Sequence, residues 1–456
     1  MTVFGMGKFD GLLSRVVNEH VGEEGVSDVV LQNEIGTIRE NLRVGIDITK
    51  AVALRANHNI AGTGFILGGR GFVLAKEDVH RMLGPNGEEN PLIYPLLNGR
   101  DLTESSRGLF TIDTIGVSEQ ELLREQPELY QHLHDTVYFD RQTNRDPRLR
   151  REWWLLRRSN EQVRAATRGL RRFIVTSETA THRLFVFVPS RVRPEHKLIV
   201  VGSDDAYMLG TLSSRIHTTW ALAAGGRLGA GNDPVYSKTL CFDPFPFPDC
   251  AETQKNTIRG KAEQLDAHRK RQRTLHPELT LTEMYNVLEK LKINEDLTAE
   301  DRAIYDAGLV GVLCKLHEEL DAAVFTAYDW PHELTDEEIL SNVVALNAER
   351  RAEEESGNVR WLRPEFQAPN ELLVQVAFVG LAPVESVALV RHKQPWPVTL
   401  TDQVRAIKNA LRAVPMQTSQ EVAAGFRPAS RVRVAEILET LTALGQTRQV
   451  EDRYLL

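Results

Sequence analysis

The sequence predicts an α+β protein, in which a mixed, β-rich domain precedes a helical region and a C-terminal module of the winged-helix type. Three observations lead to this fold class. Short apolar runs rich in β-branched and aromatic residues, at 173–175, 184–188 and 198–201, predict strands. After residue 251 the apolar residues recur every three or four positions, which predicts helices. Residues 396–456 have the pattern of three helices followed by a hairpin.

The first part of the chain divides into a lead-in segment, 1–58, and a β-rich domain, 59–250. The lead-in mixes short apolar stretches with glycine, which indicates partly β structure. At the start of the domain, glycines separate the apolar pairs Phe65-Ile66 and Phe72-Val73, as in strands joined by tight turns. The sequence FDPFPFP at 242–248 cannot continue a helix and is expected to close the domain.

Residues 251–360 are expected to form an acidic helical domain. Leu313, Leu316, Leu320 and Val324 follow helical spacing. Two Thr-x-x-acid patterns, Thr298 with Asp301 and Thr335 with Glu338, predict capping boxes at the start of two helices. Between residues 295 and 355 there are 17 acidic residues and four arginines and lysines, a net charge of −13.

A connector at 361–395 contains apolar runs at 372–379 and 386–390, which predict paired strands or an extended linker. The module at 396–456 follows, with helices expected at 400–414, 419–426 and 430–444 and a hairpin turn at Glu451-Asp452. Arginines cluster near the start of the third helix, where a recognition helix meets DNA in winged helix-turn-helix proteins: Arg427, Arg431 and Arg433. Docking to another protein remains an equally open role for such a module.

Composition excludes several classes of protein. The chain has 456 residues and a net charge of −8, and no apolar run approaches the 18 residues expected of a membrane span. The N-terminus lacks the pattern of a signal peptide. Three cysteines, Cys241, Cys250 and Cys314, make a disulfide framework improbable and suit a cytoplasmic protein. No cysteine or histidine spacing predicts a metal site.

The charge is distributed very unevenly. Residues 141–172 contain eleven arginines, no lysine and only three acidic residues, a net charge of +8. Such a cluster is typical of a surface that binds a polyanion, most plausibly nucleic acid, because the guanidinium group grips phosphate oxygens or a guanine edge in bidentate fashion. The alternative is a basic face that pairs with an acidic face of the same chain or of a partner.

Two tryptophans lie within this cluster. Arginines flank Trp153 and Trp154, so phosphates could be neutralised while the rings stack or wedge against the duplex. The alternative is that one ring anchors the core and the other covers it, which we favour for at least one of the two.

Motifs of catalysis are missing. Gly62-Thr-Gly64-Phe-Ile-Leu67 begins like a dinucleotide loop, but Leu67 stands where the third glycine belongs. Neither a phosphate-binding P-loop, nor a GxSxG elbow, nor an HExxH helix occurs. The sequence therefore predicts no catalytic residue, no cofactor-binding residue and no metal ligand.

Four further motifs carry a family resemblance. PLLNGRDL at 95–102, RREWW at 150–154, GTLSSRIH at 210–217 and FDPFPFP at 242–248 occur in this order. Together they resemble the target recognition domain of the MmeI-like, type IIL restriction–modification proteins, which are adenine-specific DNA methyltransferases. The segments LTEMYN at 281–286, LDAAVFTAYDWP at 320–331 and ILSNVVALNAERR at 339–351 are similar to the part of those proteins that follows the domain. The resemblance covers roughly residues 45–456.

The resemblance implies double-stranded DNA as a partner and a role in DNA methylation, restriction–modification and phage defence. Such proteins transfer a methyl group from S-adenosylmethionine to N6 of adenine in a catalytic domain that precedes the recognition domain. That domain carries a glycine-rich cofactor loop and an Asn-Pro-Pro-Tyr or Asp-Pro-Pro-Tyr motif, whose aromatic ring stacks on the flipped base. This sequence contains no Pro-Pro pair, and Asp233-Pro-Val-Tyr236 lies late in the recognition-like region.

We therefore expect a sequence-specific DNA recognition component that begins after a catalytic domain. It would bind no cofactor itself and would act with a separate catalytic subunit that binds S-adenosylmethionine. One alternative is a methyltransferase proper, and another is a non-catalytic adaptor without a nucleic-acid role. The residues expected to contact DNA are Arg100, Asp101, Arg145, Arg148, Arg150, Arg151, Trp153, Trp154, Arg157, Arg158, Arg215 and His217.

Overall fold

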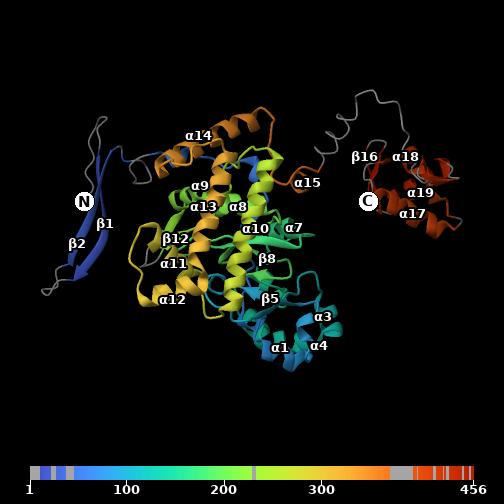
Figure 1. The fold of residues 1–456 in the computed structure, drawn as a ribbon. Helices are drawn as coiled ribbons and strands as arrows, with labels where there is room; N and C mark the ends of the chain where they lie inside the picture. Colours follow the sequence, from blue (N-terminus) through green and yellow to red (C-terminus); the bar gives the residue numbers. More distant parts are fainter. Residues whose placement is uncertain are drawn as a thin grey trace. The chain divides into compact units, whose positions relative to one another are not determined.

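The computed structural model divides the chain into two compact units, Met1–Leu373 and Val374–Leu456 (Figure 1). The structure describes residues 11–21, 27–36, 38, 46–228, 233–369, 394–397, 399–413, 417–424, 426–427, 431–443, 446–450 and 453–455. The strands expected at 372–379 and 386–390 lie outside these residues. The mixed α+β fold class is confirmed.

Strands β1 (Gly11–Val21) and β2 (Ser27–Gly36) form an antiparallel hairpin within the expected lead-in. Leu12 pairs with Ile35 near its open end, and the register shifts between Val16 and Asn18.

A four-stranded antiparallel sheet lies at the centre of the first unit, in the order β3-β10-β7-β8. Its strands are β3 (Ala61–Thr63), β7 (Arg172–Ser177), β8 (Val186–Pro189) and β10 (Leu198–Val201). All four residues of β10 are buried, as are five of the six in β7. Their continuous β-branched and aromatic sequences suit strands covered on both faces.

A second, mixed sheet has the order β4-β6-β5-β9. Its strands are β4 (Val73–Leu74), β5 (Ile93–Leu97), β6 (Phe110–Ile112) and β9 (Arg193–Pro194), with β5 and β9 parallel. It shares a separate core with α1 (Lys76–Leu83), α3 (Glu119–Glu125) and α4 (Pro127–Leu133). These three helices gather beside β5 in Figure 1.

Short helices connect the strands throughout this region. The remaining ones are α2 (Gly99–Thr103), α5 (Phe139–Gln142), α6 (Pro147–Arg151), α7 (Glu161–Thr167), α8 (Ala206–Ser213) and α9 (Arg215–Ala224). Single turns of 3-10 helix lie at Ile48–Lys50, Arg55–Asn57, Arg70–Phe72 and Gly87–Glu89, and π-helical turns at His134–Tyr138 and Lys238–Phe242. A small hairpin is formed by β11 (Gly226–Leu228) and β12 (Asp233–Val235).

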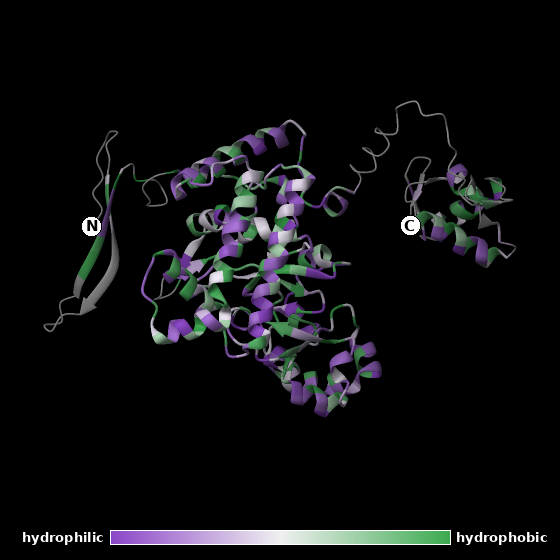
Figure 2. Ribbon diagram, viewed as in Figure 1, coloured by the Kyte–Doolittle hydropathy of each residue, from purple (hydrophilic) through white to green (hydrophobic). Residues whose placement is uncertain are grey.

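The expected helical region consists of α10 (Glu252–Leu275), α11 (Leu281–Lys292), α12 (Ala299–Gly308), α13 (Val310–Ala327) and α14 (Asp336–Glu355). The capping boxes at Thr298 and Thr335 are confirmed. Gly210 lets α10 approach α8 closely, because a Cβ there would lie 2.6 Å from Ile258. Figure 2 shows hydrophilic residues along much of the visible side of α10, whereas its buried side joins the core of the central sheet. After α14 comes the short helix α15 (Pro364–Gln367).

The second unit has its own core. Its elements are β13 (Gln394–Pro395), α17 (Leu400–Ala413), β14 (Gln417–Thr418), α18 (Ser419–Ala424), β15 (Phe426–Arg427), α19 (Arg431–Ala443), β16 (Arg448–Val450) and β17 (Arg453–Leu455). The sheet order is β14-β17-β16, and β13 pairs with β15. Ile407, Val422, Leu438 and Tyr454 bring the three helices and the hairpin into one apolar cluster.

Candidate nucleic-acid interface

The arginine-rich stretch 141–172 runs from α5 through α6 and α7 into β7, and not all of it is surface. Arg141 is only 3% exposed. Its guanidinium donates to the carbonyl oxygens of Leu155 at 2.6 Å and Leu67 at 3.2 Å, and burial lowers its pKa to about 10. These hydrogen bonds join two loops, so the guanidinium group of Arg141 is not available to bind a phosphate.

Arg164 is also turned inward, toward Asp113. The Arg164 guanidinium donates to both carboxylate oxygens of Asp113 at 2.7 Å, and Arg193 donates to the same carboxylate at 2.7 Å. Asp113 follows β6 of the second sheet, whereas Arg164 belongs to α7, which packs on β3 and β10 of the central sheet. The ion pair between Arg164 and Asp113 therefore joins the two sheets, whereas Arg193 belongs to β9 of the second sheet.

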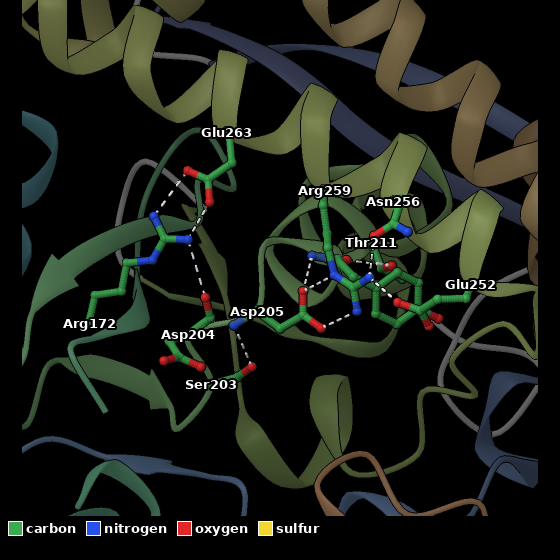
Figure 3. A network of polar contacts seen from close by, with 10 residues as sticks. Arg172, Ser203, Asp204, Asp205, Thr211, Glu252, Asn256, Arg259 and Glu263 are labelled. Carbon is green, nitrogen blue, oxygen red and sulfur yellow. Dashed lines mark hydrogen bonds and ion pairs between the residues drawn. The ribbon is translucent and has the colours of Figure 1, made fainter. Parts of the chain in front are cut away.

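Arg172, the last arginine of the stretch, connects the central sheet to α10 (Figure 3). Its guanidinium pairs with Glu263, with one contact of 3.0 Å, and donates to the carbonyl oxygen of Asp204. Next to it, Arg259 donates to both carboxylate oxygens of Asp205 at 2.7 and 2.8 Å. Burial opposes ionisation of Asp205, but its hydrogen bonds with Arg259 and the Tyr207 amide lower the pKa overall. Asp205 also caps α8, so this network fixes the start of α8 against α10.

The other arginines of the stretch reach the surface. Arg148 and Arg151 share Glu152, at 3.0 and 3.5 Å, and Arg150 donates to the carbonyl oxygen of Asn144 at 2.6 Å. Five exposed guanidinium groups have no hydrogen bond or ion pair among the described residues: Arg145, Arg157, Arg158, Arg168 and Arg171. These five are available to an anion from outside the chain.

Arg157 and Arg158 are held by their backbone rather than by their side chains. The amide of Arg157 donates to the carbonyl oxygen of Leu67 at 3.1 Å, and Arg158 forms an antiparallel bridge with Ile66. Gly68 adopts φ +75°, and a Cβ there would lie 2.4 Å from the Cβ of Arg157. The close approach of the two loops thus fixes the backbone while both guanidinium groups stay exposed.

The tryptophan pair has the alternative, structural role. Trp153 is 3% exposed, and its indole nitrogen donates to Glu119 at 3.0 Å. Trp154 is partly buried and donates to the carbonyl oxygen of Val117 at 2.8 Å. The prediction that Trp153 contacts DNA is wrong for this fold, because its ring is enclosed by Tyr130 and Tyr138.

Two more predicted contact residues are buried. Asp101 forms a capping box with Asn98 and binds the guanidinium of Arg107 with both oxygens, while its side chain is 2% exposed. His217 is fully buried and its Nε2 lies 3.0 Å from the hydroxyl of Tyr236. Both predictions are corrected, since neither side chain reaches the surface. The capping box could have been read from the Asn-x-x-Asp spacing.

Arg100 and Arg215 lie apart from the arginine stretch in sequence and have local partners. Arg100 is exposed on α2, 3.6 Å from Glu104. Arg215 begins α9 and pairs with Asp336 of α14 at 2.7 Å.

The alternative in which the basic stretch docks on the acidic region finds no support in this fold. Residues 141–172 and 295–355 are both described in full, and no ion pair joins one to the other. The inward-facing arginines use Asp113 and Glu263 instead.

The described part of the chain holds neither a candidate metal cluster nor a membrane-spanning helix. Nowhere in it do three histidine, cysteine or carboxylate side chains come together as a metal ion requires. Among its helices, none has the length and apolarity needed to cross a membrane. The three cysteines lie in it and are free thiols.

Comparison with known proteins bears on residues 58–249, which match the family model described as the target recognition domain of MmeI. DNA methyltransferase A of Bacillus subtilis (strain 168) is 29% identical over 153 residues, which are 33% of this chain and 14% of that protein. The solved structure of the type IIL restriction-modification enzyme MmeI in complex with DNA aligns with a TM-score of 0.54 and 16% identity. The alignment covers 71% of this chain and 40% of that chain, and at this identity it concerns the fold alone. The aligned part of the chain thus spans 14% of the first relative and 40% of the second.

Proposed function

We propose that the chain selects the DNA sequence on which an adenine methyltransferase acts, because residues 58–249 match the target recognition domain of MmeI. DNA recognition in a methyltransferase system is the function that the comparisons support. The specificity for adenine and the division of labour with a catalytic chain are our proposals.

The observation that carries the proposal is the set of five exposed, unpartnered arginines within this domain. Isolated guanidinium groups at a surface are strongly attracted to a phosphate backbone, since binding releases condensed counterions. The inward-facing Arg141, Arg164 and Arg172 fix the backbone that carries them. Exposed guanidinium groups on a fixed backbone can bind phosphates and so position a duplex, while other side chains contact the bases.

Methyl transfer is assigned to a separate catalytic chain. A pocket of about 640 Å³ lies among the turn Ile48–Lys50, the end of α9 and residues 239–244. Its polar lining residues are Thr49, Arg227 and Thr239, and its lining contains no carboxylate. Nucleotide sites commonly hold ribose hydroxyls with Asp or Glu. The lining of this pocket lacks that feature, and our proposal is that S-adenosylmethionine binds to the separate catalytic chain.

The recognition role is tested by replacing Arg157 and Arg158 with alanine in the full chain. The expected result is weaker duplex binding, with the slope of log affinity against log salt reduced by about two. The matched control replaces Arg81 and Arg124, two exposed arginines that already pair with carboxylates on α1 and α3. An equal loss in both double variants would mean that only net charge matters, and no loss in either would overturn the proposal.

The division of labour is tested with S-adenosylmethionine that carries a labelled methyl group. The purified chain alone is expected to leave duplex adenines unlabelled. Labelling by the chain alone would show that it is a methyltransferase proper.

A further inference from the structure

Helix α7 lies against the central sheet at close range, because glycines stand opposite it. The buried residues of the helix are Val163 and Ala166. A Cβ at Gly62 of β3 would lie 2.7 Å from Cγ2 of Val163, and a Cβ at Gly202 would lie 2.6 Å from the Cβ of Ala166. Any larger residue at these two positions would displace the helix, so its inward face is fixed by packing.

Hydrogen bonds fix both ends of α7. Just before the helix, the side-chain amide of Asn160 donates to the carbonyl oxygen of Thr63 at 2.7 Å. In the last turn, the guanidinium of Arg363 donates to the carbonyl oxygen of Ala166 at 2.6 Å. Between the two ends, Arg164 forms the ion pair that joins the two sheets. A helix of seven residues is too short to persist in water by itself, so these contacts give it a single position.

The outward face of α7 presents three different kinds of group. Glu161, Ala165 and Arg168 are exposed, and they follow each other at the four- and three-residue spacing of one helical face. Among the described residues, the carboxylate of Glu161 accepts one hydrogen bond, from the hydroxyl of Ser159 at 2.7 Å, and it has lone pairs for more. The face therefore offers an acceptor, a methyl group and a cation on a rigidly held element, which is the requirement for a specific contact.

Unpartnered arginines flank this face at both ends. Two precede the helix and two follow it, and all four are exposed without a hydrogen bond or ion pair of the guanidinium among the described residues: Arg157, Arg158, Arg168 and Arg171. At a rise of 1.5 Å per residue, the seven residues of α7 span about 10 Å. The major groove of B-DNA is about 12 Å wide. The two pairs of cations are therefore separated by about the distance between the phosphate backbones that border this groove.

We propose that α7 is the element that enters the major groove, so that its outward face meets base edges while the arginine pairs at its ends bind the two phosphate backbones. The duplex as partner comes from the proposed function, on which this assignment rests. The carboxylate of Glu161 repels phosphate, but it is an acceptor for the amino group at N4 of cytosine. The methyl group of Ala165 suits contact with the methyl group of thymine. Glu161 is thereby assigned to the choice of one base pair.

The test is the selection of duplexes from a random pool by the full chain and by its Glu161→Gln variant. The variant is expected to lose preference for cytosine at one position by about 5- to 150-fold, the range for one base contact. The slope of log affinity against log salt is expected to stay the same, because no phosphate contact is removed, and this unchanged slope shows that the variant is folded. Glu128→Gln is the matched control. Glu128 is exposed in the first turn of α4, another helix of seven residues, and its variant should keep the preference of the unchanged chain.

A second variant tests whether α7 spans the groove. Replacing Arg168 and Arg171 with alanine is expected to reduce the salt slope by about two, as in the Arg157/Arg158 variant. An unchanged slope in this variant, or an unchanged base preference in Glu161→Gln, overturns the role of α7. It leaves the proposed function in place as long as the unchanged chain enriches one sequence. No enrichment by the unchanged chain overturns the proposed function itself, and the role of α7 with it.

Discussion

At the scale of single residues, Asp113 is the anion on which the arrangement of the recognition domain depends. Its side chain is 3% exposed, and it receives hydrogen bonds from Arg164 and Arg193, which lie over the rings of Phe65 and Tyr94. Without this carboxylate, the positive charges of the largely buried Arg164 and Arg193 would have no counter-charge between them.

Asp113→Asn is expected to destabilise the first unit by about 3–5 kcal/mol, because it removes one partner of a buried ion pair and leaves the others charged. Chemical denaturation measures the change. Asp140→Asn is the control, since Asp140 is exposed. A loss below about 1 kcal/mol would mean that water already solvates the two arginines.

His217 gives the domain a dependence on pH. Burial, with a smaller effect of the nearby Arg183, lowers the pKa of His217 from 6.5 to about 3. The unfolded chain therefore binds a proton that the folded chain rejects. This contribution to stability is complete above about pH 6.5 and is lost as the pH falls toward about 3. The pKa of the buried His317 is also lowered, so it acts in the same direction.

His217→Gln is expected to make the fall in stability between pH 6 and 4 shallower by about 1.4 kcal/mol per pH unit, the effect of one proton. The free energy of unfolding is measured at several pH values in that range. His276→Gln is the control, because the side chain of His276, at the end of α10, is 39% exposed. An unchanged slope in the His217 variant would contradict a neutral, buried imidazole.

Which residues of the predicted site reach the surface depends on tertiary packing, and the sequence shows this only in part. Arg141 and Arg157 are the same residue type in similarly basic sequence, yet Arg141 is buried between two loops and Arg157 is exposed. His217 follows Arg215 in a motif that suggests a surface, but the helix α9 turns its imidazole into the core. A helical wheel that grouped His217 with Trp220 and Ala221 could have indicated this.

At the scale of elements, the backbone carbonyl oxygens of the proline-rich segment 242–248 accept hydrogen bonds mainly from side chains and not from a neighbouring strand. Prolines remove backbone donors, so its carbonyl oxygens need partners from elsewhere. Asn57 donates to the carbonyl oxygens of Phe242, Asp243 and Phe245 at 2.8–3.0 Å. Further partners are Asn347 to Pro244, Tyr328 to Pro246 and Tyr207 to Pro248. The segment thereby joins the turn at Arg55–Asn57 to α8, α13 and α14.

Asn57→Ala is expected to cost about 1–3 kcal/mol, because buried carbonyl oxygens lose their donor. Thermal unfolding compared with Asn358→Ala, a change at an exposed asparagine, measures the difference. An equal effect of the two substitutions would show that water enters and replaces the amide.

The long helices and the buried strands β7, β8 and β10 were predictable, whereas the shortest strands and helices were not. Apolar spacing and capping boxes indicate helices α13 and α14 in the sequence. The two-residue strands β4 and β9 are too short for any alternation to be visible, and they exist only because β6 and β5 lie beside them. The helices between residues 76 and 167 are short as well, and several depend on local caps such as Ser118 with Glu121.

At the scale of the whole molecule, charge is separated along a chain whose net charge is only −8. Five arginines of the basic stretch are exposed without a partner, and no ion pair joins that stretch to the acidic helices at 295–355. An acidic protein with exposed arginines in one stretch can bind DNA through that stretch and repel it elsewhere, which favours one orientation of the duplex.

The central claim is that this chain recognises a particular DNA sequence, and selection from a pool of random duplexes tests it most directly. The purified chain is incubated with the pool, and the bound duplexes are sequenced. We predict enrichment of one short sequence, together with an Arg157/Arg158 double alanine variant that enriches the same sequence with lower affinity, because phosphate contacts weaken binding at all sequences. Recovery of bound duplexes with no enriched sequence, or of none above background, would contradict the account.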